Sequence, residues 1–344
     1  MSKLSKDITE QDYSAYIKLI NTGLSQRKAC KQLDIDRTKM QRYLKKVEVG
    51  GIVQDVLQGT SGNDYSDWEV KDKPILNKPK ICYLDIEKTF NISGHFNAWG
   101  QDLKQTSKFK ESHILSYCFA FNDDTEIKGS ILTGKELKDD FLKCLETGNP
   151  HTSIDELLTL ELWSLFNNSN VIVAYNGRGF DVKEINARFL YYGLPMPSPY
   201  KVIDPLLIVK NKFRLPFKSL KYVAEFLGVT QKLDNSGNDM WKRASLGDQE
   251  ALDEMYKYNE YDVIVLREVY KKVQGWGNSG TNLALYSDHG AKCPCCSSDD
   301  VTALTDKFSY TSARKYQAYR CVDCGATLRS NKAEGKGNSL VLVI

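Results

Sequence analysis

The sequence predicts an α/β fold in its central part, a mixed β-sheet flanked by helices, placed between a small helical domain and a cysteine-rich domain. Three observations lead to this prediction. Apolar runs of strand length alternate with segments of helical spacing between residues 80 and 276, which is typical of a sheet covered by helices. Residues 1–47 combine short helical patterns with an excess of basic side chains. Five of the nine cysteines lie between residues 293 and 324, in closely spaced pairs.

These observations divide the 344 residues into four parts. Residues 1–47 form the helical head, and residues 48–79 form a linker, because scattered glycines interrupt any helical stripe there. Residues 80–276 form the α/β domain, and residues 287–344 form the cysteine-rich tail. The whole chain has a formal net charge of +3, yet residues 1–47 alone carry +6 and the remainder carries −3. A basic head on a mildly acidic body is typical of a protein that binds nucleic acid through that head.

The head contains a candidate helix-turn-helix. Ser25 is placed to cap a first helix that contains Ala29 and Leu33, residues 34–36 form a turn, and residues 38–44 form a second helix. This pattern resembles the DNA-binding domains of recombinases and transposases, in which the second helix enters the major groove of duplex DNA. The expected contacts with bases or phosphates come from five basic residues: Arg37, Lys39, Arg42, Lys45 and Lys46. The alternative is a small helical bundle that docks on another protein.

Hydrophobic periodicity places the elements of the α/β domain. Short apolar runs or apolar–polar alternation predict strands over residues 81–86, 114–121 and 171–175. Apolar residues three and four apart predict helices over residues 154–166, 182–192, 220–227 and 249–273. Gly193 and Gly228 end two of these helices, as glycine often does. Asp204 follows another strand-like run, and we expect it to have a structural role.

The first predicted strand ends in two carboxylates, within the sequence YLDIEKT of residues 83–89. Asp85 and Glu87 are two residues apart, so both side chains point to the same face of the strand. Two adjacent carboxylates repel each other unless a cation lies between them, and oxygen ligands favour Mg²⁺ or Mn²⁺. Taken alone, the pair is more commonly an ordinary acidic strand end.

Two further acidic positions follow along the chain. The segment VIVAYNGRGFDVKEINARF begins with a buried strand and contains Asn176 and then Asp181. Asp181 lies at the N-terminus of a helix, where it can face the space beside the strand, cap the helix, or do both. On the long helix, Tyr258 and Asp262 are four residues apart and share one face, as a surface pair on an amphipathic helix also would. The three pieces together, in this order and within one α/β domain, are far more specific than any one of them.

In this order the motifs resemble those of DnaQ-like (DEDD) exonucleases of the tyrosine subclass. Over roughly residues 80–275 the chain is similar to the proofreading exonuclease domains of family B DNA polymerases, and residues 218–228 (KSLKYVAEFLG) resemble a helix that those domains carry between the second and third motifs. The resemblance implies a ribonuclease-H-like fold and a 3′–5′ exonuclease that hydrolyses DNA with two Mg²⁺ or Mn²⁺ ions. It assigns the metals to four carboxylates, with Asp85 bridging both ions: Asp85, Glu87, Asp181 and Asp262. It implies that Tyr258 helps to position the attacking water. We also expect Asn176 to contact the nucleic acid.

One position departs from this family pattern, because Lys88 stands where a threonine usually follows the glutamate, with Thr89 next. Such a lysine pairs either with a phosphate of the substrate or with a carboxylate. Nothing in the chain resembles a polymerase body, so the resemblance implies a stand-alone nuclease or an accessory subunit of a DNA polymerase or another replication protein. Single-stranded 3′ ends are then the expected substrate at the carboxylates, with duplex DNA at the head. The alternatives are a DNA-binding protein that uses an inactive nuclease fold as a scaffold, and a structure-specific endonuclease or ribonuclease. All five expected catalytic positions are filled, which argues against the scaffold.

The tail carries two CxxC pairs separated by 24 residues, within AKCPCCS and RCVDCG. Four thiolates in two such pairs suit tetrahedral Zn²⁺ in a zinc ribbon with a structural role, and the expected ligands are Cys293, Cys296, Cys321 and Cys324. The role of Cys295 is left open by the sequence, and a spare thiol is one interpretation. Tyrosines interleave with basic residues between residues 307 and 320, a pattern that fits single-stranded nucleic acid and equally an ordinary solvated ribbon.

The remaining sequence signals concern the location of the protein. No run of about 18 apolar residues predicts a membrane-spanning helix, and the polar N-terminus is unlike a secretory signal. Paired cysteines of metal-binding spacing fit a reducing compartment. We therefore expect a cytoplasmic protein, in a bacterial cell or a phage-infected host, without a membrane partner.

Overall fold

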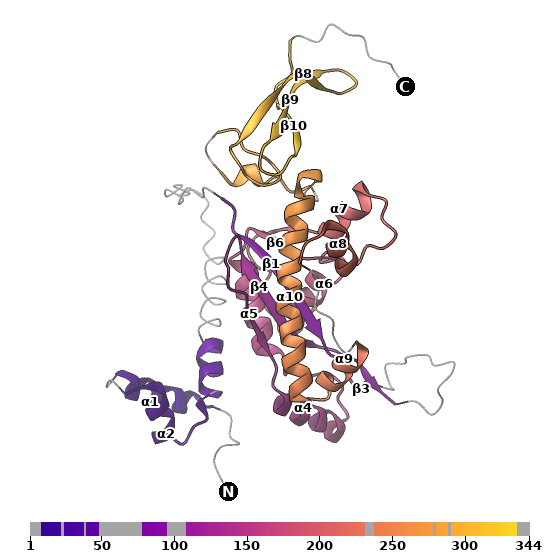
Figure 1. Cartoon of the computed structure of the whole chain (residues 1–344). Helices are drawn as coiled ribbons and strands as arrows, with labels where there is room; N and C mark the ends of the chain where they lie inside the picture. The colour runs from indigo at the N-terminus through magenta and orange to yellow at the C-terminus, as the bar shows by residue number, and fades with distance from the viewer. Residues whose placement is uncertain are drawn as a thin grey trace.

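The computed structural model describes residues 8–21, 24–37, 39–47, 78–94, 108–230, 237–277, 280–287 and 290–335. Residues 48–77, which make up most of the predicted linker, lie outside the described residues. Figure 1 shows the α/β domain in the middle, with the helical head near its lower end and the cysteine-rich tail beyond the upper end of α10. Within the described part of the chain, no helix is both long and apolar enough to cross a membrane.

The α/β domain is built on a five-stranded sheet in the order β5-β4-β1-β6-β7. β1 is central, antiparallel to β4 and parallel to β6, while β5 and β7 extend the sheet on the two sides. The strands are β1 (Ile81–Lys88), β4 (Ile114–Phe121), β5 (Lys128–Ile131), β6 (Val171–Val173) and β7 (Lys201–Ile203). The predicted mixed sheet is therefore confirmed, and the predicted carboxylate-bearing strand lies at its centre.

Helices cover both faces of this sheet. They are α4 (Gly134–Thr147), α5 (Glu156–Asn167), α6 (Asp181–Tyr191), α7 (Pro205–Lys212), α8 (Leu220–Leu227), α9 (Asn238–Ser245) and α10 (Gln249–Val273), followed by the short turns η4 (Gln274–Trp276) and η5 (Leu283–Tyr286). The bounds predicted for α8 and α10 are those observed, because a polar N-cap marks the start of each. Ser219 and Asp248 accept hydrogen bonds from the first turns of these helices, and Gly228 ends α8 at a positive φ of 61°.

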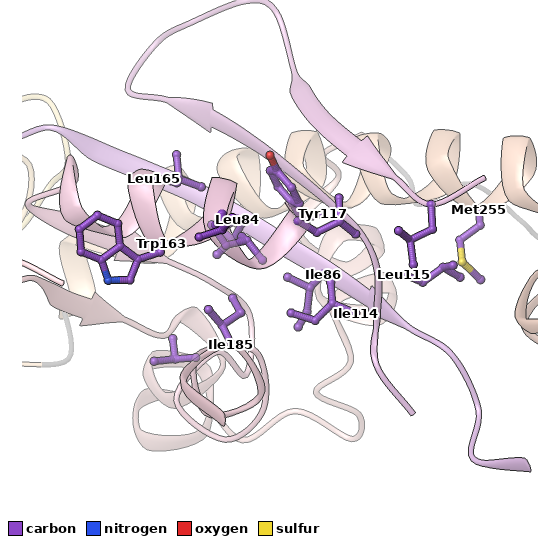
Figure 2. Packing of buried hydrophobic residues seen from close by; sticks show 14 of the residues in the cluster. Leu84, Ile86, Ile114, Leu115, Tyr117, Trp163, Leu165, Ile185 and Met255 are labelled. Carbon is purple, nitrogen blue, oxygen red and sulfur yellow. The ribbon is translucent and has the colours of Figure 1, made fainter. Parts of the chain in front are cut away.

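Successive residues of β1 enter different apolar layers. Leu84 and Ile86 pack in one core layer with α5 and α6 (Figure 2). Tyr83 packs in the other layer, with α7, α8 and the second half of α10. Figure 1 shows α10 crossing the sheet over β1. Because side chains alternate along a strand, Asp85 and Glu87 lie on the same face as Tyr83, which is the face that α10 covers.

The head is a small helical unit with its own core. It contains α1 (Glu10–Asn21), α2 (Gln26–Gln32) and helical residues 39–47, packed around four buried side chains: Tyr16, Ala29, Cys30 and Met40. Ser25 occupies the N-cap position of α2, but its hydroxyl makes no capping hydrogen bond, and Leu33 ends the helix. Asp34 has a φ of +52°, which makes the predicted turn.

The tail contains a three-stranded sheet, β10-β9-β8, formed by β8 (Val301–Tyr310), β9 (Lys315–Cys321) and β10 (Thr327–Arg329). It packs against the end of α10. A Cβ added to Gly275 would lie 2.0 Å from the carbonyl oxygen of Cys324, so only glycine fits there. Leu283, just before the tail, is buried in the core layer of α10. Two short strands, β2 (Ile92–Ser93) and β3 (Lys108–Lys110), form a separate pair beside the main sheet.

Candidate metal centres

Three of the predicted carboxylates meet where α10 crosses β1. One oxygen each of Asp85, Glu87 and Asp262 lies within 4.8 Å of the others. Asp262 is 3% exposed, while Asp85 and Glu87 are half-buried. Three anionic carboxylates this close repel one another, and hard divalent cations such as Mg²⁺ or Mn²⁺ remove that repulsion. The donor set therefore fits a metal site built from oxygen ligands.

The fourth predicted carboxylate, Asp181, lies against this cluster without belonging to it. It is 3% exposed at the first position of α6, and its Oδ1 accepts a hydrogen bond from the backbone N–H of Ile86 at 3.4 Å. Burial raises the pKa of Asp181 to about 7, and the charges of Asp204 and Asp262 act in the same direction. A carboxyl buried beside other carboxyls is held near the protonated state until a cation neutralises the group.

The loop that presents Asp181 is held by Asp204. This residue caps α7 through Leu206, and its two oxygens also accept hydrogen bonds from the backbone N–H groups of Asn176 and Arg178, at 3.0 and 3.3 Å. The structural role predicted for Asp204 is confirmed. Asn176 is exposed and has a φ of +63°, and its carbonyl oxygen accepts from Phe180, which closes the turn before α6. The contact of Asn176 with nucleic acid stays a prediction.

Tyr258 lies one turn before Asp262 on α10, as predicted, and is 9% exposed. Two neighbours that no sequence motif singled out hold the carboxylates of β1. Asn259 donates from Nδ2 to Oδ2 of Asp85 at 2.7 Å, and Trp241 of α9 donates from Nε1 to Oε2 of Glu87 at 3.0 Å. The ring of Trp241 also packs edge-on against Tyr258, with the ring centroids 5.6 Å apart.

Lys88, the residue that departs from the family pattern, forms an ion pair with Glu184 of α6. Of the two partners expected from the sequence, the structure therefore shows the carboxylate. Because Lys88 follows Glu87 and Glu184 follows Asp181 by one turn, the pair ties the end of β1 to the first turns of α6. Lys88 contributes positive charge beside the carboxylate cluster without entering it.

The tail brings the four predicted cysteines together. The sulfurs of Cys293, Cys296, Cys321 and Cys324 lie within 4.8 Å of one another, and two pairs, Cys293–Cys324 and Cys296–Cys321, are 3.6 Å apart. Four sulfurs at the corners of a tetrahedron around Zn²⁺, each with a bond of about 2.3 Å, would be separated by about 3.8 Å. The arrangement therefore fits a structural zinc site.

Backbone N–H groups also point at these sulfurs, a pattern that stabilises thiolates. Cys295 donates from its backbone to Sγ of Cys293 at 3.4 Å. Similar bonds run from Ser298 to Cys296, from Cys324 to Cys321 and from Ala326 to Cys324. The thiol of Cys295 itself is buried, which raises its pKa to about 12, and it lies outside the four-cysteine group. Cys295 thus contributes its backbone rather than its sulfur.

Three of the five basic residues predicted to contact DNA form ion pairs with the α/β domain instead. Arg42 pairs with Glu136 of α4, and two lysines pair with glutamates of α5, Lys45 with Glu161 and Lys46 with Glu156. Arg37 is exposed and Lys39 is half-buried. The second helix of the head therefore lies along an acidic surface of its own chain, and its binding to DNA stays a prediction.

Comparison with known proteins identifies the fold of the α/β domain. Residues 135–274 match the model of the RNase H superfamily, a range that includes Asp181, Tyr258 and Asp262 and begins after Asp85 and Glu87. The domain is thus a ribonuclease-H-like mixed sheet flanked by helices. The solved structures that match the chain include the family B DNA polymerase from the hyperthermophilic archaeon Pyrobaculum calidifontis, with 14% sequence identity and a TM-score of 0.37. That match covers 63% of this chain and 28% of the polymerase. None of the curated proteins compared matches the chain.

Proposed function

We propose that this protein is a metal-dependent 3′–5′ exonuclease of DNA. The observation that carries the proposal is the meeting of Asp85, Glu87 and Asp262 within 4.8 Å on a ribonuclease-H-like domain, with Tyr258 one helical turn from Asp262. Asp181, buried against the same strand, supplies the fourth carboxyl. The order of the three motifs resembles that of the DEDD exonucleases of the tyrosine subclass, which supports the 3′–5′ polarity.

The side chains of the site would have two roles, metal binding and positioning of the attacking water. Asp85, Glu87, Asp181 and Asp262 would hold two divalent cations. The chemistry that such cations would supply is activation of the attacking water and stabilisation of the leaving 3′ oxygen. The hydroxyl of Tyr258 is a hydrogen-bond donor and acceptor that positions the water. Four carboxylates balance the charge of two divalent cations, so the site becomes neutral only when both are bound.

In this proposal the head would bind DNA, and the tail would support the helix that carries Tyr258 and Asp262. The net charge of +6 on residues 1–47 supports a contact with the phosphates of duplex DNA. Arg37, which is exposed, would make that contact in the described arrangement, whereas three basic residues first have to leave their glutamates. A zinc-stabilised tail would hold the end of α10, and a DNA polymerase or another replication protein is the expected partner.

Digestion of 5′-labelled single-stranded DNA in the presence of Mg²⁺ or Mn²⁺ tests the proposal. Wild type should produce a ladder that shortens from the 3′ end, and Asp85→Asn should reduce the rate to background. Asp253→Asn is the matched control, because Asp253 is an exposed aspartate on the same helix as Asp262 and should leave the rate unchanged. Absence of cleavage by wild type with either metal would favour the scaffold alternative. Internal cuts in a labelled duplex would favour the endonuclease.

A further inference from the structure

Helix α9 enters the carboxylate site although it belongs to none of the three motifs. It packs beside α10 (Figure 1) and is anchored by Met240 and Ala244, which are fully buried in the core. Ser245, at its last turn, accepts a hydrogen bond from the backbone N–H of Phe90 at 3.0 Å, just after β1. These contacts fix α9 to both elements that carry the carboxylates.

The side chain that α9 places in the site is Trp241. Its indole N–H donates to Oε2 of Glu87 at 3.0 Å, while its ring lies at 81° to that of Tyr258 with the centroids 5.6 Å apart. One rigid side chain therefore contacts a proposed metal ligand on β1 and the proposed water-positioning residue on α10. An indole has a single donor and no acceptor, so this contact has only one productive orientation.

Asn259 holds the other carboxylate of β1 in a similar way. It is fully buried, donates to Asp85 at 2.7 Å, and accepts from the hydroxyl of Ser116 on β4 at 3.3 Å, which fixes the orientation of its amide. Both donors are neutral. A lysine or arginine in either place would neutralise the carboxylate and compete with a cation, whereas an N–H group of an amide or an indole orients the carboxylate and leaves its charge available.

We propose that Trp241 is a positioning residue that sets the orientation of Glu87 and the ring of Tyr258 before metal binds. The inference rests on the proposed function, because it takes Glu87 as a metal ligand. With Oε2 of Glu87 held by the indole, the orientation of this carboxylate is restricted before a cation would bind. Asn259 restricts the orientation of Asp85 in the same way. Because both carboxylates are already oriented, little side-chain conformational entropy would be lost when metal binds.

Direct titration of zinc-loaded full-length protein with Mn²⁺, following free Mn²⁺ by electron paramagnetic resonance, tests this role without relying on activity. Trp241→Phe keeps an aromatic ring against Tyr258 and removes the N–H donor. Loss of an outer hydrogen bond to a metal ligand typically weakens metal binding or activity by about 10–100-fold, and we expect an effect of this size on the Mn²⁺ affinity of the variant. In digestion assays, the Mn²⁺ concentration at half-maximal rate should rise by a similar factor.

Two controls separate positioning from folding. Trp276→Phe removes an indole that is 60% exposed and packs on Phe213 at the far end of α10, and should bind Mn²⁺ as wild type does. Trp241→His restores a ring N–H and should recover part of the affinity even if Trp241→Phe lowers the melting temperature.

The outcomes for the two proposals differ. If wild type binds Mn²⁺, Asp85→Asn does not, and Trp241→Phe binds as tightly as wild type, the positioning role is wrong while the metal site stands. If wild type itself does not bind Mn²⁺, the proposed metal site is wrong and the role of Trp241 falls with it.

Discussion

Replacing Asp181 by asparagine is expected to stabilise the metal-free protein, and to do so more strongly as the pH rises. Burial raises the pKa of Asp181 from 3.8 to about 7, so the folded protein binds this proton more tightly than the unfolded chain does. Stability from this group is therefore fully present below pH 4, falls as the pH rises, and is lost above pH 7. A shift of about 3 units corresponds to a penalty on the order of 4 kcal/mol above pH 7.

Asparagine keeps an Oδ1 acceptor for the backbone N–H of Ile86 and carries no charge at any of these pH values. Between pH 5 and pH 8, the stability difference between Asp181→Asn and wild type should therefore grow by about 3 kcal/mol in favour of the variant. Urea unfolding at both pH values measures it, without chelators because these would also remove zinc from the tail. Mn²⁺ should stabilise wild type at pH 8 more than the variant, since a cation removes the penalty on the buried carboxylate.

The control for this experiment is Asp253→Asn, which removes an exposed carboxyl of α10 and should follow the pH profile of wild type. Equal pH dependence of Asp181→Asn and wild type would refute the reasoning, because it would mean that the carboxyl of Asp181 ionises in the folded protein at little cost. A variant that loses stability at pH 8 would do the same.

The zinc site, the junction of the tail and the ion pairs of the head give three further expectations. Cys321→Ser should abolish zinc binding, measured by metal analysis, and unfold the tail, since structural zinc contributes about 10–16 kcal/mol in small zinc domains; full retention of zinc would contradict the four-cysteine site. Gly275→Ala should lower thermal stability by roughly 1–3 kcal/mol, because the new Cβ would meet the carbonyl of Cys324, and an unchanged melting curve would show that the junction yields. Replacing Glu136, Glu156 and Glu161 together by glutamine, which keeps the capping role of residue 136, should raise affinity for duplex DNA on the order of tenfold at low salt by freeing three basic residues. Equal affinities of this variant and wild type in a low-salt binding titration would argue against competition between the acidic surface and DNA.

The parts of the site that the sequence predicted are those set by local periodicity. Asp85 and Glu87 share a face because a strand alternates, and Tyr258 and Asp262 share a face because a helix repeats every 3.6 residues. Both expectations depend only on neighbours along the chain, and the structure confirms both, bringing Asp85, Glu87 and Asp262 together. The two CxxC pairs are equally local, and their four sulfurs also meet.

The residues that the sequence did not reveal act across long separations. Trp241 reaches Glu87 over 154 positions, and Arg42 reaches Glu136 over 94, and no spacing rule connects either pair. A lone tryptophan on a short helix looks like any core aromatic until the fold places its N–H beside a carboxylate. The basic residues of the helical head likewise predict a negatively charged partner. That partner can be a phosphate of DNA or a glutamate of the same chain, and the sequence does not distinguish between them.

Short elements were missed for a different reason. α7 and α9 have eight residues each, as α8 does, but α7 (PLLIVKNK) groups its apolar residues in one run and α9 (NDMWKRAS) has few of them. Neither therefore shows the apolar spacing that predicted α8. Of the three-residue strands, β6 was predicted because its residues form an unbroken apolar run, whereas β7, which begins with Lys201, was noted only as a strand-like run before Asp204. α4 is longer and has a capping box at Thr133, but its many charged residues obscure its apolar stripe.

The length of α10 sets the distance between the carboxylate cluster and the cysteine-rich tail. Asp262 lies eleven residues before Val273, the last residue of the helix, and Gly275 then meets the tail backbone at Cys324 with no room for a side chain. At 1.5 Å per residue, Asp262 and the start of the cysteine-rich tail are about 17 Å apart along the axis of this helix. The helix is therefore a spacer as well as a carrier of Tyr258 and Asp262. Adding or removing one helical turn would move the tail by about 5.4 Å relative to the carboxylates while leaving both ends intact.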